Sequence, residues 1–274
     1  MTRVCHVAVP RIFAIVAALT VPLVPASPAP AAGPIGEVID CALRSLPASA
    51  HGRFVLDSRS AQGVAREVHG EYWAEQPKDS GRRVVIASRG GANMARAAYL
   101  FSEGDAIGEV WLWTPDHGDA RRIQARGDAG RLFGSDVTLE DFARFARINF
   151  PGQLRRLDDA SVAGRPVYVV ETRPSADVGS EYERIVSSID KEWCVILRRE
   201  SFDASFEGGS KPRKVQSVSP TDVKHEKGYA RATAALLQDL RDGTQTKVSL
   251  EDLNLDAKLP SSFFTPEKLA EAAK

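Results

Sequence analysis

Three acidic residues, Asp136, Glu140 and Asp141, are the first candidates for catalytic or metal-binding chemistry in this sequence. Neighbouring carboxylates can act as general acid and base, or they can bind a hard cation. The same three residues also stand at the start of a segment with helical spacing. Acids in that position cap free backbone N–H groups and interact favourably with the helix dipole. Thr138, three residues before Asp141, completes a pattern that resembles a capping box. We therefore interpret these acids as helix N-terminal residues.

The other motifs that could support catalysis lack the context that their chemistry needs. Ser188 and Lys191 match S-x-x-K, in which lysine deprotonates serine across one helical turn, but here they fall in a predicted strand and the turn after it. The sequence contains no G-x-S-x-G, Walker or H-E-x-x-H motif. Four histidines lack the spacing of metal ligands: His51, His69, His117 and His225. We expect no enzymatic activity, no cofactor and no metal.

Aromatic residues at strand and helix spacing are better suited to binding an apolar ligand. Trp111 and Trp113 project from one face of a predicted strand, while apolar residues project from its other face, so both faces need cover. We predict that six residues line an apolar cavity: Tyr99, Phe101, Trp111, Trp113, Phe142 and Phe145. There are two alternatives to a cavity lining. The aromatic residues could pack an ordinary core between a helix and the sheet, or they could form a surface for a partner.

Strands must position most of these residues. Alternating apolar residues and turn signals predict strands at 52–58, 64–75, 82–88, 92–102, 106–114, 120–125, 161–173, 182–189, 193–203, 211–220 and 248–255. Helical spacing predicts helices at 35–46, 139–146, 229–241 and 266–273. Many consecutive strands with few crossover helices favour an antiparallel sheet in a mainly β protein of the α+β class.

The N-terminus has the order of a secretory signal peptide. Arg3 and Arg11 flank a short charged region, residues 12–24 are almost entirely apolar, and Ala29-Pro30-Ala31 fits a cleavage site. A retained membrane anchor is the alternative, but the apolar run is shorter than the ~20 residues of a spanning helix. Cys5 precedes the run and therefore cannot be a lipoprotein attachment site. We expect cleavage after Ala31 and a soluble periplasmic domain from residue 32 to 274.

The composition of this domain limits its partners and its cross-links. The chain has 36 basic and 36 acidic residues, and removal of residues 1–31 leaves it nearly neutral, so nothing in its charge favours nucleic acid. Cys41 and Cys194 are the two cysteines that remain after cleavage. In an oxidising compartment such a pair is a candidate disulfide, although two buried free thiols are an alternative.

An ordered set of short motifs resembles a known family. Val110-Trp111-Leu112-Trp113-Thr114-Pro115 is followed by Gly134-Ser135-Asp136-Val137-Thr138-Leu139-Glu140-Asp141, then by Gly164-Arg165-Pro166-Val167-Tyr168-Val169-Val170-Glu171. Lys214 and the C-terminal Phe263-Phe264-Thr265-Pro266 complete the set. From about Cys41 to the C-terminus, the chain resembles the outer-membrane lipoprotein-sorting proteins of the LolA-like superfamily. Positions 137 and 139 depart from the pattern, because relatives commonly carry an aromatic residue there.

The resemblance implies a strongly curved antiparallel half-barrel whose concave face is plugged by helices. It also implies a function, namely carriage of lipid or acylated lipoprotein cargo between the inner and outer membranes. An inner-membrane exporter and an outer-membrane acceptor would be the partners. The alternative is a lipid-sensing module that uses the same cavity to regulate a partner protein.

Overall fold

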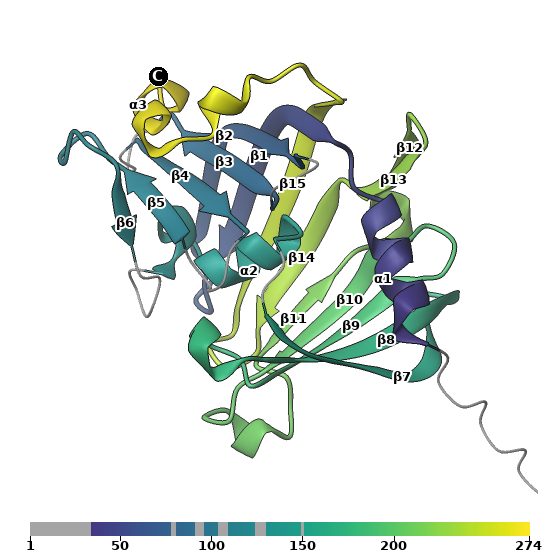
Figure 1. The fold of residues 1–274 in the computed structure, drawn as a ribbon. Coiled ribbons are helices and arrows are strands. Elements are labelled where there is room, and N and C mark those ends of the chain that lie inside the picture. Colours follow the sequence, from purple (N-terminus) through teal and green to yellow (C-terminus); the bar gives the residue numbers. More distant parts are fainter. Residues whose placement is uncertain (1–33, 78–80, 91–95, 104–108, 124–129, 149–150) are drawn as a thin grey trace, which may run out of the picture. The chain divides into compact units, whose positions relative to one another are not determined.

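The computed structural model describes residues 34–77, 81–90, 96–103, 109–123, 130–148 and 151–274. Within these residues the main element is an antiparallel sheet of thirteen strands (Figure 1). Its strands, in chain order, are β1 (Ser49–Arg59), β2 (Ala65–Glu75), β3 (Arg83–Ser88), β4 (Ala97–Ser102), β5 (Glu109–Trp113), β6 (Arg121–Ile123), β7 (Gly152–Val162), β8 (Arg165–Pro174), β9 (Arg184–Asp190), β10 (Ile196–Phe202), β11 (Lys214–Ser217), β14 (Ala234–Asp239) and β15 (Thr244–Leu255). A separate hairpin is formed by β12 (Val223–Glu226) and β13 (Tyr229–Ala232). The α-helices are α1 (Ile35–Arg44), α2 (Leu139–Phe145) and α3 (Leu269–Ala272). The predicted mainly β, antiparallel class is confirmed.

The order of the strands explains why α2 lies against a face of the sheet. The sheet runs β6-β5-β4-β3-β2-β1-β15-β14-β11-β10-β9-β8-β7, so the chain moves outward from β1 to one edge and returns from the other edge. The connection between the two edges, β6 to β7, has to cross the sheet, and α2 lies in this connection. The last strand, β15, then pairs with the first, β1, over the long register from Ala50↔Leu255 to Arg59↔Gln245.

The helices pack on different parts of the sheet. Phe142 of α2 is fully buried in the largest core cluster, together with Phe54 and Phe101 from the strands. Leu269 of α3 is buried against the opposite face of β3 and β4, beside Phe264. α1 packs its buried side on β8 and β9. No helix in the described ranges combines the length and the apolar character that crossing a membrane would require.

Two predicted elements are wrong, and each error has a physical cause. The segment 161–173 is not one strand, because Ala163 and Gly164 have positive φ values of 50° and 78° and form a hairpin turn between β7 and β8. β7 escaped prediction because it is an edge strand, mostly exposed, without apolar alternation. The alanine-rich segment 229–241 is β13 and β14 rather than a helix, because pairing of β14 with β11 and β15 outweighs the helix propensity of alanine.

The predicted helices α1, α2 and α3 are present, and the start of α2 has the predicted capping box. Thr138 accepts a hydrogen bond from the backbone N–H of Asp141 at 3.1 Å, and the Asp141 carboxylate accepts one from the N–H of Thr138 at 3.0 Å. The predicted signal peptide, residues 1–31, lies outside the described residues.

Candidate functional site

α1 is fixed onto the sheet by a covalent bond and by polar contacts near its start. Cys41 is bonded to Cys194, which lies shortly before β10, with a Cα–Cα distance of 5.2 Å. This is the pairing predicted from the sequence. Glu37 accepts hydrogen bonds from the Tyr168 hydroxyl at 2.7 Å and from Arg156 at 3.1 Å. α1 therefore has a defined position over β8 and β9.

An apolar cavity of about 420 Å³ lies between α1 and the strands β7 to β10. The side chains on its helix wall include Ile35, Val38, Ile39, Ala42 and Leu43. Those on its sheet wall include Leu154, Val170, Ile185, Ile189 and Ile196. Ile39, Leu43 and Leu154 are 40%, 53% and 49% exposed, so the apolar lining continues to the protein surface. Large apolar side chains that line a cavity and also reach solvent are typical of a binding site rather than of a closed core.

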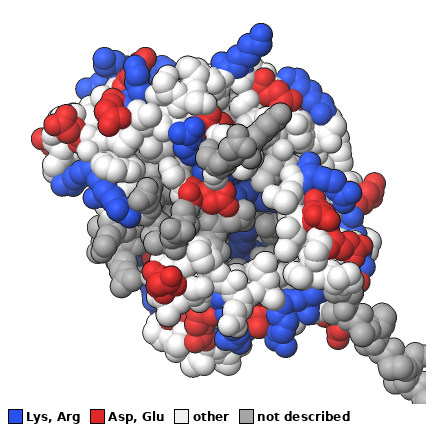
Figure 2. All heavy atoms as spheres, in the orientation of Figure 1, with Lys and Arg blue, Asp and Glu red and all other residues white. Residues whose placement is uncertain are grey.

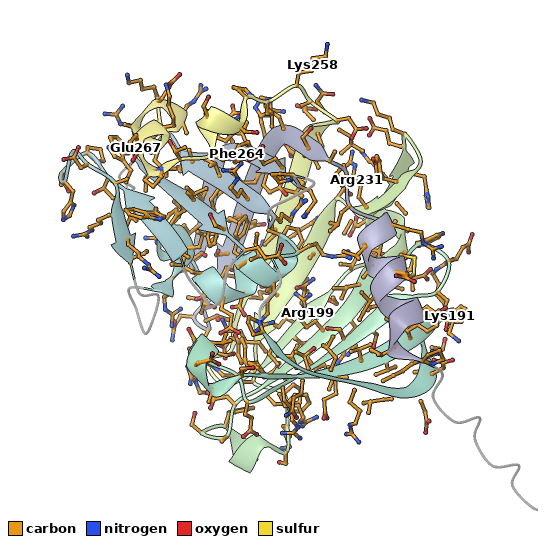
Figure 3. The ribbon with its side chains drawn as sticks, viewed as in Figure 1. Lys191, Arg199, Arg231, Lys258, Phe264 and Glu267 are labelled. Carbon is orange, nitrogen blue, oxygen red and sulfur yellow. A yellow bond between two sulfur atoms is a disulfide. The ribbon has the colours of Figure 1, made fainter. Side chains whose placement is uncertain are left out.

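Arginines form the inner part of this cavity. Arg144 at the end of α2, Arg147 just after it, and Arg199 of β10 all line the cavity. The same three residues line an adjoining cavity of about 100 Å³, which also contains Arg82. Figure 2 shows a hollow in this face of the molecule with basic side chains recessed inside it, and Figure 3 shows Arg199 beside α2. Positive charge therefore lies between two apolar spaces.

These arginines differ in their partners. Arg144 donates to Glu140 at 2.7 and 2.9 Å, a bifurcated contact along α2. Arg147 donates to the carbonyl of Ala42 at 2.7 Å, and Arg199 donates to the side chain of Gln216 at 3.2 Å. Among the described residues, neither Arg147 nor Arg199 forms an ion pair with a carboxylate.

Burial acts directly on the charge of these two groups. Desolvation, followed by the nearby charge of Arg82, lowers the pKa of Arg147 to about 10. Desolvation, followed by the charges of Arg144 and Arg147, lowers the pKa of Arg199 to about 9. Both guanidinium groups therefore remain protonated at neutral pH. The charges of Asp141 and Glu140 raise the pKa of Arg199, but they do not offset its desolvation and the nearby arginines.

The acids at the start of α2 all have structural partners, and Asp141 caps the helix as predicted, whereas Asp136 and Glu140 pair with arginines. The Asp141 carboxylate contacts the ammonium of Lys214 and accepts a hydrogen bond from the Tyr182 hydroxyl at 2.6 Å. Burial opposes ionisation, but Lys214 and Tyr182 outweigh it and hold the pKa of Asp141 below its ordinary value. Asp136 accepts from Arg131 at 3.2 Å instead of capping the helix. In the described part of the chain, no group of three or more His, Cys, Asp or Glu residues could hold a metal ion.

The structure divides the six aromatic residues predicted to line a cavity. Tyr99, Phe101, Phe142 and Phe145 meet on the α2 side of the sheet, with ring centroids 5.1 Å apart for Phe101 and Phe142 and 6.4 Å for Phe142 and Phe145. Of these four, Phe145 lines the smaller of the two cavities described above, and the other three are packed in the core beside it.

The two tryptophans lie on the opposite side of the sheet. Trp111 and Trp113 pack in the cluster that contains Leu269 of α3. The Trp113 indole N–H donates to the carbonyl of Gly118 at 2.7 Å, which satisfies its polar atom within the turn after β5. The strand does have apolar cover on both faces, as expected, but α2 covers one face and α3 the other.

Sequence reasoning missed the arginines and the part played by α1. One signal was available. Arg198 and Arg199 are adjacent in a predicted strand, so one of them has to point to the inner face. Arg147 gave no such signal, because its orientation depends on the way α2 ends. It has a φ of 66°, the left-handed conformation that glycine usually adopts at this position.

Comparisons with known proteins agree with this architecture. A family model described as "uncharacterized protein" matches residues 86–271. No curated protein matches the chain. Among solved structures, a domain from Vibrio parahaemolyticus described as an outer membrane lipoprotein-sorting protein is 19% identical, with a TM-score of 0.71 over 84% of this chain and 95% of that one.

Two further structures share the fold. A DUF1329 family protein from Desulfovibrio piger is 17% identical, with a TM-score of 0.73 over 85% of this chain and 96% of that one. A LolA superfamily protein from Nitrosomonas europaea is 16% identical, with a TM-score of 0.64 over 84% of this chain and 96% of that one. At these identities the likeness is one of fold.

Proposed function

Because this chain belongs to the family whose model matches residues 86–271 and has the fold of the LolA superfamily, we propose that it carries lipid or acylated lipoprotein cargo. The observation that supports this most strongly is the cavity beneath α1, which has apolar walls and an apolar rim. An acyl chain gains about 0.8 kcal/mol for each CH₂ that leaves water. The membrane offers nearly the same gain, so transfer of a chain between bilayer and protein is close to neutral and reversible.

The finer parts of the proposal follow from the same resemblance. The sheet would form a curved half-barrel within a single domain from residue 32 to 274, with helices on its concave face. The protein would act in the periplasm between an inner-membrane exporter and an outer-membrane acceptor. It would bind its cargo without chemically changing it, since the two buried acids of α2 are both engaged. Lys214 and Tyr182 hold Asp141, and Arg144 and Ser180 hold Glu140.

Filling the cavity from the α1 side should weaken binding of an acyl chain. Ala42 lines the cavity, and Ala42→Trp places a large side chain in the space that the ligand would use. Displacing about two CH₂ groups of the chain costs on the order of a tenfold loss of affinity. The measurement is displacement of a fluorescent fatty-acid probe from the purified protein.

Arg44→Trp is the matched control for this variant. Arg44 lies on the same helix, is exposed and does not line the cavity, so the same side chain there should leave probe binding unchanged. Equal binding by Ala42→Trp and the parent protein would exclude this cavity as the site.

Export should remove the N-terminal segment. Arg3, Arg11, the apolar run 12–24 and the Ala29-Pro30-Ala31 order predict that the exported protein begins at Ala32. Intact mass spectrometry of the periplasmic fraction measures this directly. A product that retains Met1 would contradict the proposed localisation.

A further inference from the structure

Three arginines without a carboxylate partner gather where the cavity beneath α1 adjoins the smaller cavity, among the residues that the structure describes. Arg82, Arg147 and Arg199 line the smaller cavity together. The charge of Arg82 lowers the pKa of Arg147, and the charge of Arg147 lowers that of Arg199. Among the described residues, none of the three guanidinium groups forms an ion pair with a carboxylate. Arg82 is buried, and Arg147 and Arg199 are half-buried. Holding unpaired like charges close together away from water is costly, so a fold retains them only where something compensates.

The two acids whose charges act on Arg199 have other hydrogen-bond partners. Glu140 accepts from Arg144, from the Ser180 hydroxyl at 2.7 Å and from the backbone N–H of Glu181 at 2.8 Å. Asp141 is held by Lys214 and Tyr182. Their charges raise the pKa of Arg199, but neither carboxylate forms a hydrogen bond or ion pair with Arg82, Arg147 or Arg199 in the described part of the chain.

Arg82 provides an independent indication of a missing partner. It is 4% exposed, its Nε donates to the carbonyl of Ala146 at 2.8 Å, and its Nη2 lies 3.4 Å from the Tyr72 hydroxyl. Its Nη1 atom is buried without any hydrogen-bond partner. A buried guanidinium N–H at the wall of a cavity is a donor that a ligand oxygen could satisfy.

The backbone at the end of α2 shows that the position of Arg147 is maintained at a cost. A non-glycine residue with a φ of 66° is strained by about 1 kcal/mol. This conformation turns the side chain toward α1, where it donates to Ala42. Strain of this kind is often found at binding sites.

From these contacts we propose that the cargo is an amphiphile with an anionic oxygen head group, either a carboxylate or a phosphate. Arg82, Arg147 and Arg199 bind the head group, and the acyl chain lies in the apolar cavity under α1. The inference rests on the proposed carrier function and specifies its ligand. Guanidinium groups suit this task, because their planar forks match the oxygens of carboxylates and phosphates.

The test compares ligands that share a chain and differ in charge. Palmitate, 1-palmitoyl lysophosphatidate and 1-hexadecanol are compared, each below its aqueous solubility limit, by displacement of a fluorescent fatty-acid probe from the delipidated exported protein. Both anions are expected to bind at least about tenfold more tightly than the alcohol, as charge-assisted hydrogen bonds predict. The ratio between the two anions identifies the head group as a carboxylate or a phosphate.

Arg199→Gln should weaken binding of both anions at least about tenfold more than binding of hexadecanol, so that the preference is lost. Arg198→Gln is the matched control, because Arg198 is the preceding residue of β10, points to the other side and pairs with Glu200. Arg147→Gln repeats the test at a second site in case Arg199→Gln does not fold.

The outcomes separate the two proposals. If hexadecanol binds as tightly as palmitate, or if Arg199→Gln and Arg147→Gln weaken all three ligands equally, the head-group inference is wrong and the carrier function stands. If none of the three ligands binds, the carrier function fails and the head-group inference fails with it.

Discussion

Replacing Cys41 and Cys194 together by serine is expected to lower the free energy of unfolding by about 5 kcal/mol. The bond closes a loop with a sequence separation of 153, and in the chain-entropy model a loop of this length gives a stabilisation of that size. The same variant should lose acyl-chain binding, because the disulfide holds α1, which forms one wall of the cavity. Urea unfolding followed by circular dichroism measures the first effect, and probe binding measures the second.

The control for this variant is Cys5→Ser, which lies in the predicted signal peptide and should not alter the exported protein. An unchanged unfolding midpoint in the double variant would show that the disulfide contributes little to the free energy of unfolding. Lower stability with full probe binding would show instead that α1 is not a wall of the binding site.

Asp141→Ala should cost about 3 kcal/mol of stability. Removal of the carboxylate abolishes the cap on the N–H of Thr138, the acceptor for Tyr182 and the closest partner of the buried Lys214. Lys214 keeps a longer contact with Asp239 at 3.9 Å, so its charge is not left entirely alone. Asp136→Asn is the control, because Asp136 pairs with the partly exposed Arg131 and should change stability little.

The pH dependence of stability gives a second measurement of the same group. The pKa of Asp141 is lowered in the folded state, so its contribution is complete above the unfolded value near 3.9. The contribution is lost as the pH falls toward and through the lower folded pKa. Asp141→Ala should therefore flatten the decline of the unfolding free energy in acid. An equally steep decline in this variant would assign the acid sensitivity to other carboxylates.

Local signals in the sequence predicted much of this fold. The capping box at Thr138 and the strand alternation are patterns over a few residues, and both matched the structure. The disulfide was predicted because only two cysteines remain after cleavage, and it is also present. β7 and β14 were misjudged for the opposite reason, since an exposed edge strand and an alanine-rich strand are defined by their neighbours. The curvature of the sheet remains a prediction.

The candidate site was harder to predict because it depends on contacts between distant segments. α1, the end of α2 and β10 are separated by long stretches of chain, and the crossing from β6 to β7 brings α2 beside the others. Of the six aromatic residues predicted to line one cavity, Tyr99, Phe101, Phe142 and Phe145 lie together in the structure. Alternation alone could not tell which face of β5 would meet α2. Trp111 and Trp113 consequently pack against α3 instead.

The most direct test of the carrier function is native mass spectrometry of the protein purified from the periplasm, followed by extraction of any bound molecule. We expect a species heavier than the mature polypeptide by the mass of one acyl-chain lipid, and loss of that species in Ala42→Trp but not in Arg44→Trp. A bare polypeptide mass that persists after incubation with lipid vesicles would contradict the account.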